Sequence, residues 1–140
     1  MQKSTRNLRR GRKCVFLMHA HLVFVTKYRR RVFTKKILKD LKEIFTDVCL
    51  DFKSELSEFD GEYDHVHLLV NFPPTVSISK LVNSLKGVSS RLLRKKNYPS
   101  VEKSLWGKSF WSPSYFAGSC EGAPISVIRQ YIEQQKTPLN

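Results

Sequence analysis

The order of predicted strands and helices favours an α+β fold of the ferredoxin-like kind: an antiparallel sheet with two helices on one face, followed by a C-terminal helix. Two observations carry this prediction. Strand-like segments and amphipathic helical patterns follow one another as β-α-β-β-α-β-(β)-α. The chain has 140 residues, 41% of them hydrophobic, and no repeat or low-complexity linker divides it. We therefore expect a single domain over residues 1–140.

The first strand and helix are predicted from contrasting hydrophobic patterns. Residues 15–28 are rich in β-branched and aromatic side chains and predict a strand. From Thr34 to Phe52, large apolar residues recur at intervals of three or four, which predicts an amphipathic helix.

Two further strands are predicted on either side of a turn. Residues 54–59 form a short strand pattern, and Asp60-Gly61 is a turn signal. The strand that begins at His65 ends before Pro73, because proline cannot continue a strand ladder.

The second half of the chain completes the pattern. Ser77 is a candidate N-cap for a second amphipathic helix that extends to about Lys96. Gly87 lies in the middle of this helix and predicts a close backbone approach. Residues 104–119 supply one or two aromatic strands, and Pro124 opens the last helix.

Charge is unevenly distributed along the sequence. Lys and Arg number 25 against 12 acidic residues, which gives a net charge of +13. Residues 40–64 hold nine of the twelve acids, so the rest of the chain is strongly basic. This polarity predicts a polyanionic partner, and nucleic acid above all. Residues 1–13 carry six basic residues and no acid, and we expect a flexible basic arm there.

The cysteines and the hydropathy pattern bear on the cellular compartment. Cys14, Cys49 and Cys120 are far apart and lack C-x-x-C spacing, which predicts free thiols in a reducing cytoplasm. No apolar run reaches the roughly 18–20 residues of a membrane span, so we expect no membrane partner.

Two histidine pairs have the same i, i+2 spacing. In "DHVHLLV", His65 and His67 share one face of the predicted strand, and the other face is wholly apolar. Two imidazoles on one open face can bind a cation together, with Asp64 and Glu62 as hydrogen-bonding partners behind them. A pair of polar residues tolerated in a strand is the simpler alternative.

The pair in "HAH", His19 and His21, shares its face with Val23 and Val25, and no carboxylate lies within ten residues. We expect a hydrogen-bonded structural role for this pair.

Tyr131 and Gln135 of the last helix are four residues apart and lie on one helical face. Tyr131 is either part of the amphipathic packing or a covalent nucleophile, and Gln135 offers a neutral oxygen ligand.

Four segments together resemble a known family. "DHVHLLVNFPP", "LVNSLKGVSSRLL", "LWGKSFWSPSYFAGSC" and "IRQYIEQQ" resemble the HUH single-tyrosine transposases of the smallest bacterial insertion sequences, where HUH stands for His, a hydrophobic residue and His. The similarity extends from His21 to about Gln135. Tyr63 stands where the family has a proline, which affects only the shape of that turn.

The resemblance implies an activity and its residues. It implies a metal-dependent transposase that cleaves and rejoins single-stranded DNA hairpins at element ends through a 5′-phosphotyrosine. By position, His65, His67 and Gln135 match the ligands of a Mg²⁺ (or Mn²⁺) ion, and Tyr131 matches the nucleophile. It also implies a homodimer in which the tyrosine helix can complete the partner's site.

Contacts with DNA are predicted from the basic residues in the arm, after the first strand and on the second helix: Arg12, Lys13, Lys27, Arg29, Arg30, Arg31, Lys86, Arg91, Arg94 and Lys95. Four aromatic residues can stack on bases or fill the core, and for each alone the core is favoured: Trp106, Trp111, Tyr115 and Phe116.

Two other functions remain open from the sequence. A non-catalytic ferredoxin-like module that binds single-stranded nucleic acid would explain the charge and the aromatic residues. A domesticated HUH nickase would keep the chemistry in another role. The sequence does not reveal the DNA bases recognised or whether Tyr131 acts in its own subunit or in its partner's.

Overall fold

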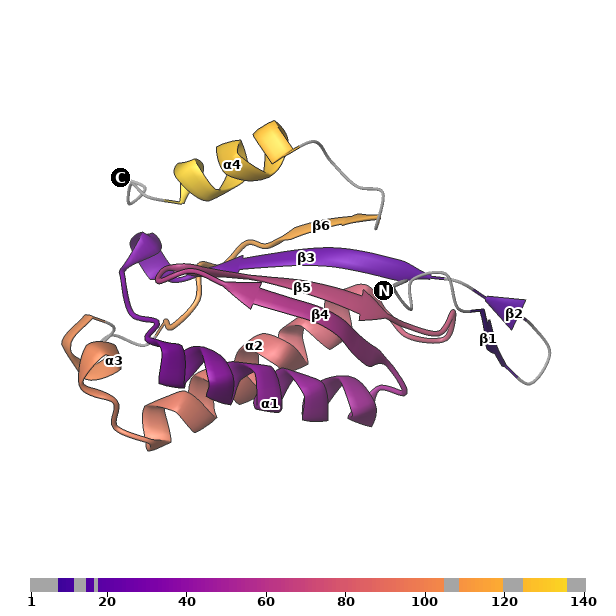
Figure 1. The fold of residues 1–140 in the computed structure, drawn as a ribbon, viewed down its shortest axis with the longest axis horizontal. Coiled ribbons are helices and arrows are strands. Elements are labelled where there is room, and N and C mark those ends of the chain that lie inside the picture. Colours follow the sequence, from indigo (N-terminus) through magenta and orange to yellow (C-terminus); the bar gives the residue numbers. More distant parts are fainter. Residues whose placement is uncertain (1–7, 12–14, 17, 105–108, 120–124, 136–140) are drawn as a thin grey trace.

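The computed structural model describes residues 8–11, 15–16, 18–104, 109–119 and 125–135. Its centre is a four-stranded antiparallel sheet with the strand order β4-β5-β3-β6 (Figure 1). The strands are β3 (His19–Val25), β4 (Glu55–Gly61), β5 (His65–Asn71) and β6 (Phe116–Ser119). With α1 (Lys35–Asp51) after β3 and α2 (Ile78–Lys95) after β5, this is the ferredoxin-like arrangement, and the predicted fold class is confirmed.

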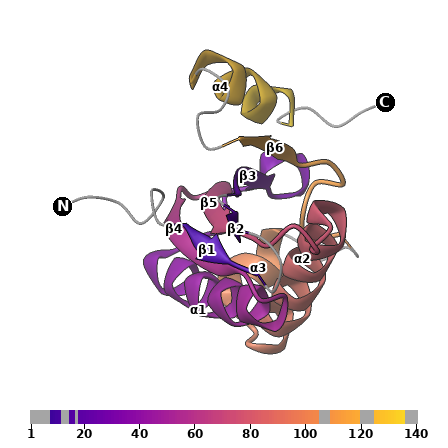
Figure 2. The same ribbon diagram turned by 90° about the vertical axis from the view of Figure 1, so that its right-hand side faces the viewer.

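Helices cover both faces of this sheet. Helices α1 and α2 lie side by side on one face, and α4 (Ile125–Gln134) lies on the other (Figures 1 and 2). Alternate residues of β3 serve the two layers: Leu22 and Phe24 belong to the main core, whereas Val23 and Val25 pack against α4. The side-chain period of two in a strand thus allows β3 to contact helices on both sides.

Both long helices begin at a capping residue. The Thr34 hydroxyl accepts a hydrogen bond from the backbone N–H of Ile37 at 3.2 Å. The Ser77 hydroxyl accepts one from the N–H of Lys80 at 3.3 Å. Each cap satisfies a donor that has no partner within its own helix, which fixes where the helix starts. The predicted boundaries of α1 and α2 are confirmed within one or two residues.

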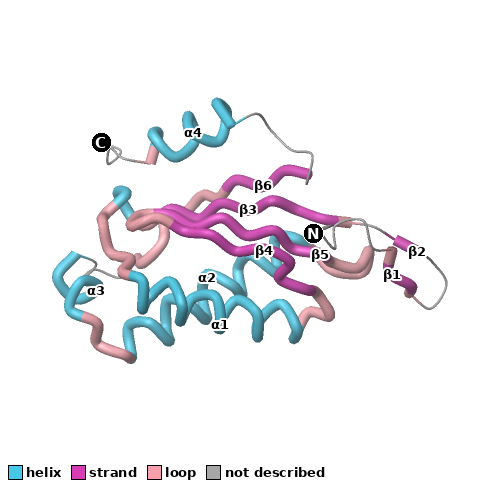
Figure 3. The backbone as a smooth tube through the Cα atoms, in the orientation of Figure 1, coloured by secondary structure: helices cyan, strands magenta, loops and turns pink. Residues whose placement is uncertain are grey.

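Part of the N-terminal arm is paired in the structure, and the flexibility expected of residues 1–13 stays a prediction. Strand β1 (Arg9–Arg10) pairs with β2 (Val15–Phe16) in a small hairpin beyond the end of the main sheet (Figure 3). The Arg9 guanidinium donates to Asn71 Oδ1 at 3.0 Å and to the Lys53 carbonyl at 2.8 Å. These bonds tie the hairpin to the ends of β4 and β5.

The predicted strand over residues 15–28 is interrupted and shorter. Strand β3 ends at Val25, where its ladder with β5 also ends. A short 3₁₀ turn, η2 (Lys27–Arg29), follows, in which Tyr28 and Arg29 have φ angles of 54° and 57°. Because non-glycine residues rarely adopt the left-handed region, β-propensity alone could not anticipate this turn.

One smaller expectation is not met, and one helix was not anticipated. Among the described residues, no atom beyond the helix's own backbone and the neighbouring residues lies within 4 Å of a Cβ built on Gly87, so this part of the structure shows no close backbone approach at the glycine. A short helix, α3 (Pro99–Ser104), was not predicted. It begins at a proline, which suits the first turn of a helix because that N–H needs no partner. Of the residues expected to form aromatic strands, 105–108 lie outside the described part.

Within the described residues, no helix is long and apolar enough to cross a membrane. Cys49 is buried in the main core, and burial raises the pKa of its thiol to about 12. Cys14 and Cys120 lie outside the described residues.

Candidate active site

The two histidines of "DHVHLLV" lie on the open face of β5. The residues that alternate with them, Val66, Leu68 and Val70, are buried in the core beneath α1 and α2. The imidazoles of His65 and His67 therefore lie on the α4 side, with ring centroids 5.1 Å apart. Strand alternation places both rings where a single cation can reach them.

Asp64 holds the first of these histidines. Its Oδ1 lies 2.7 Å from His65 Nδ1, and its Oδ2 accepts from Arg29 Nε at 2.6 Å. Burial of Asp64 opposes ionisation, but the hydrogen bonds from His65 and Arg29 outweigh it and keep the pKa of the carboxyl below its ordinary value. The carboxylate can only accept, so it fixes the proton of His65 on Nδ1.

Glu62, the other predicted partner, contributes differently. Its backbone N–H donates to the carbonyl of His65 at 2.8 Å, and its side chain is exposed at the rim of the site. Glu62 therefore supports the turn before β5.

His67 is held by a histidine from the neighbouring strand. His21 Nε2 lies 3.1 Å from His67 Nδ1. Burial, together with the charges of His65 and His21, lowers the pKa of His67 to about 4. His67 is thus neutral at physiological pH, as a metal ligand must be.

His21 was expected to have only a structural role, together with His19. The expected hydrogen bond exists for His21, but its partner is a residue of the candidate site. For His19 it is not found: Nε2 is buried and has no hydrogen-bond partner among the described residues. Sequence distance concealed the contact between His21 and His67, since 46 residues separate the two histidines. The β3–β5 register, in which Val23 lies opposite His67, could have indicated it.

A pocket of about 690 Å³ lies between β3, β5 and α4. Helix α4 supplies one wall through Ile128, Arg129, Ile132 and Glu133. The remaining wall is formed by residues from β3, η2, the turn between β4 and β5, and the start of β5: His21, Arg29, Glu62, Tyr63, Asp64, His65 and His67. We call this the histidine pocket.

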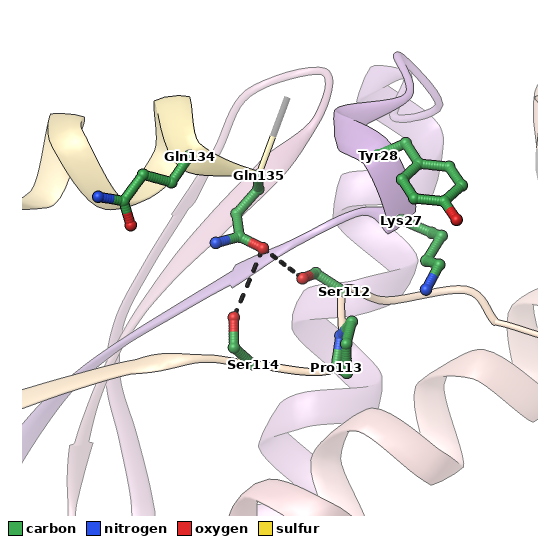
Figure 4. Close-up of a pocket in the computed structure, with 7 residues that line it drawn as sticks. All are labelled: Lys27, Tyr28, Ser112, Pro113, Ser114, Gln134 and Gln135. Carbon is green, nitrogen blue, oxygen red and sulfur yellow. Dashed lines mark hydrogen bonds between the residues drawn. The ribbon is translucent and has the colours of Figure 1, made fainter. Parts of the chain in front are cut away.

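Tyr131 and Gln135 lie close together, and among the described residues their hydrogen-bond partners do not include the histidines. The Tyr131 hydroxyl lies 2.9 Å from Ser114 Oγ, and Gln135 Oε1 accepts hydrogen bonds from Ser112 and Ser114 (Figure 4). Ser112, Ser114 and Gln135 line a second pocket, of about 540 Å³, which has no lining residue in common with the histidine pocket. Among the described residues of one chain, no hydrogen bond and no common pocket lining joins Tyr131 or Gln135 to His65 or His67.

The environment of Tyr131 does not activate its hydroxyl. Burial raises the pKa of Tyr131, and the hydrogen bond with Ser114 only partly offsets this. Its ring packs against Phe116, with centroids 6.2 Å apart. The phenol is therefore neutral and held in place in this arrangement.

Lys86 and Arg29, two of the predicted DNA-binding residues, make short polar contacts within the chain. Lys86 Nζ donates to the carbonyls of Ser112 and Ser114 at 2.7 and 2.8 Å, and burial lowers its pKa to about 8. Arg29 pairs with Asp64 and, through Nη1, with Glu133 of α4 at 2.9 Å. For both residues a phosphate contact stays a prediction.

The remaining candidates differ in position. Arg30, Arg31, Arg91 and Lys95 are exposed, and Lys27 and Arg94 are partly buried. Arg12, Lys13 and the aromatic Trp106 lie outside the described residues. Trp111 is buried and donates to Ser89 Oγ, which confirms its expected core position. Tyr115 and Phe116 are partly buried.

The histidines fit a divalent cation as two of its ligands. Each Nδ1 has a partner within the chain, so Nε2 is the nitrogen of each ring that can bind a metal. Among the described residues, no group of three or more His, Cys, Asp or Glu side chains could hold a metal ion by itself. A complete site therefore needs a ligand of another type, and Gln135 is a candidate.

Comparisons with known proteins identify the family of this chain. The family described as "Transposase IS200 like" matches residues 14–135. The ISDra2 transposase TnpA of Deinococcus radiodurans is 33% identical over 128 residues, which cover 91% of each protein. A transposase for the insertion sequence element IS200 of Salmonella typhimurium is 29% identical over 115 residues, 82% of this chain and 74% of the relative.

Solved structures share the fold. A crystal structure of a transposase candidate from D. radiodurans superimposes with a TM-score of 0.82 at 32% identity and covers 93% of this chain and 99% of its own. A REP-associated tyrosine transposase bound to a REP hairpin has a TM-score of 0.57 at 13% identity, over 89% of this chain and 68% of its own, which shows a common fold.

These matches bear on the first of the alternatives left open by the sequence, the non-catalytic binding module. A family match over most of the chain, with relatives that are matched over most of their own length, favours an enzyme over a non-catalytic binding module. The chain belongs to the IS200-like transposase family and is a DNA strand transferase.

Proposed function

We propose that this transposase cleaves and rejoins single-stranded DNA through a 5′-phosphotyrosine on Tyr131, with a divalent cation bound by His65 and His67. One observation carries the proposal: both imidazoles lie on the open face with Nδ1 engaged, in a pocket walled by the helix that bears Tyr131. Bound Mg²⁺ or Mn²⁺ would act as a Lewis acid on the scissile phosphate.

The chain's own residues account for the remaining steps. The Tyr131 oxygen bonds to phosphorus while the bond to the DNA 3′-oxygen breaks, and the phenolic proton passes to that oxygen, directly or through water. The products are a 5′-phosphotyrosine and a free 3′-OH. Since the phosphodiester bond is conserved in the adduct, attack by another 3′-OH restores Tyr131 and joins new ends without ATP.

We further propose that the active form is a homodimer in which α4 of one copy serves the histidine pocket of the other. Support comes from the partners of the two groups: Tyr131 and Gln135 form hydrogen bonds with Ser114 and Ser112, and among the described residues none of their hydrogen bonds reaches His65 or His67. Gln135 of a second copy would supply the third ligand that the histidine pair lacks.

The substrate we propose is a DNA hairpin at the ends of the mobile element. A structural relative with the same fold is bound to a REP hairpin. The net charge of +13 favours a polyanion, and the exposed residues Arg91 and Lys95 on α2 are available for phosphates.

The test of the nucleophile is covalent capture. Oligonucleotides that contain the hairpins flanking the gene carry a label at the 3′ end, because the fragment that remains on the protein is the 3′ one. With Mg²⁺ the natural protein should form an SDS-resistant adduct. Tyr131→Phe should form none, and Tyr115→Phe, which removes a nearby phenol from the loop before β6, should form as much as the natural protein. An adduct with Tyr131→Phe, or undiminished cleavage in EDTA, would contradict the proposal.

Mixing variants tests the exchange of α4. His67→Ala and Tyr131→Phe are co-expressed with different tags, and with random pairing about half of the dimers contain one copy of each. If α4 acts on the partner, one of the two sites in each mixed dimer has both an intact histidine pair and Tyr131, and random pairing restores about a quarter of the sites. If α4 acts within its own chain, no adduct forms.

A further inference from the structure

We propose that His21 is a positioning residue for His67: its Nε2 accepts a hydrogen bond from His67 Nδ1–H, so that His67 presents the lone pair of Nε2 to the cation. The inference deepens the metal site proposed above and rests on it. It concerns a histidine from a different strand that the sequence pattern assigned to structure alone.

The sheet brings the two rings together. In the β3–β5 register, His21 lies opposite Leu69 and Val23 lies opposite His67. His21 and His67 are thus diagonal neighbours on one face, within reach of each other's side chains. The rings are 5.3 Å apart at their centroids and inclined by 31°.

The ring of His21 is itself held in place. Phe116 of β6 packs edge-on against it, at 6.1 Å and 74°. β6 pairs with β3, with Phe116 opposite Val23. His21 therefore lies between an aromatic ring on one side and His67 on the other, in a fixed orientation.

The direction of the hydrogen bond decides whether His67 can bind a metal. A neutral imidazole has one N–H donor and one acceptor nitrogen. If Nδ1 of His67 donates to His21, its Nε2 keeps a lone pair. If His21 donates instead, the proton of His67 lies on Nε2 and blocks it as a ligand.

Asp64 positions His65 in the same way, because its Oδ1 lies 2.7 Å from His65 Nδ1. The two ligands thus have different partners, one anionic and one neutral. A neutral partner for His67 adds no negative charge to a pocket that must also admit a phosphate group.

The experiment compares His21→Gln, whose side-chain oxygen can still accept a hydrogen bond, with His21→Leu, which fills a similar volume without an acceptor. Two-bond ¹H–¹⁵N spectra of the metal-free proteins at neutral pH report which nitrogen of His67 carries the proton. Electron paramagnetic resonance gives the dissociation constant for Mn²⁺. Both readouts are independent of DNA cleavage.

We expect the Nδ1–H tautomer of His67 in the natural protein and in His21→Gln, with Mn²⁺ affinities within a few-fold of each other. In His21→Leu the Nε2–H tautomer should become populated, and Mn²⁺ should bind about 10- to 100-fold more weakly. An unchanged tautomer and affinity in His21→Leu would overturn the inference.

Failure of the proposed function is distinguishable from failure of this inference. If Mn²⁺ binds the natural protein no better than it binds His67→Ala, the metal site is wrong, whatever His21 does. If His21→Leu does not fold, the ¹H–¹⁵N spectrum of the natural protein still tests the inference. An Nε2–H tautomer of His67 in the natural protein would overturn the role of His21.

Discussion

The two faces of β5 differ in environment although they alternate along seven consecutive residues. On the core face, Val66, Leu68 and Val70 are 1% exposed or less. On the open face, His65, His67 and Leu69 are only partly buried. The comparison shows how one short strand serves two purposes: the core face supplies stability, so the open face can carry polar groups at little cost to folding.

The open face also has a small apolar cluster of its own. Val23 and Val25 of β3 pack against Ile128 and Ile132 of α4. This cluster lies beside the histidine pocket and attaches the helix to the sheet. Burial on the open face thus serves to place α4, which bears the proposed nucleophile.

The largest effect is expected on the open face. His67→Ala should reduce adduct formation by about 100-fold or more, because loss of a ligand removes Lewis-acid assistance worth several kcal/mol. Hairpin binding, measured by a gel-shift assay, should remain within a few-fold of that of the natural protein. His19→Ala is the matched control, since His19 lies on the same sheet face but outside the histidine pocket. Equal losses in both variants would contradict a specific role for His67.

On the core face, the expected effect is on stability. Leu68→Ala should lower the free energy of unfolding by about 2–5 kcal/mol, because it removes a fully buried side chain. Leu69→Ala, one residue along and partly buried on the open face, should cost roughly 1 kcal/mol. Urea denaturation measures both. Comparable costs at the two positions would show that the faces are not as different as their exposure indicates.

The smallest effect concerns Lys86, which links the two layers. It extends from α2, on the core side, to the loop whose serines contact Tyr131 and Gln135. Its pKa of about 8 lies below the ordinary 10.5, so between these values the unfolded chain holds more protons. The stability of the natural protein relative to Lys86→Met should therefore rise as pH increases from about 8 to 10.

Thermal or urea unfolding of both proteins across this pH range provides the measurement, and the other titrating groups cancel in the difference. Below about pH 8 the difference should be constant, since Lys86 is then protonated in both states. A difference that stays constant up to pH 10, or falls, would show that burial does not penalise the charge of Lys86.

Several features were predictable because they depend on short stretches of chain. The caps at Thr34 and Ser77, the apolar stripes of α1 and α2 and the common face of His65 and His67 follow from local periodicity. The left-handed turn at Tyr28 and Arg29 and the docking of Arg9 could not be predicted in this way. They depend on where strands end and on contacts with residues distant in sequence.

The sequence by itself determined the ferredoxin-like order of elements, the face on which the histidine pair lies and the family to which the chain belongs. Only the tertiary structure decided that His21 contacts His67, that Arg29 joins Asp64 to α4, and that Tyr131 and Gln135 contact Ser112 and Ser114. The physical reason is the sequence separation over which each feature is determined. Side-chain periodicity is fixed within a few residues, whereas strand register and helix docking are set by packing between segments far apart in the chain.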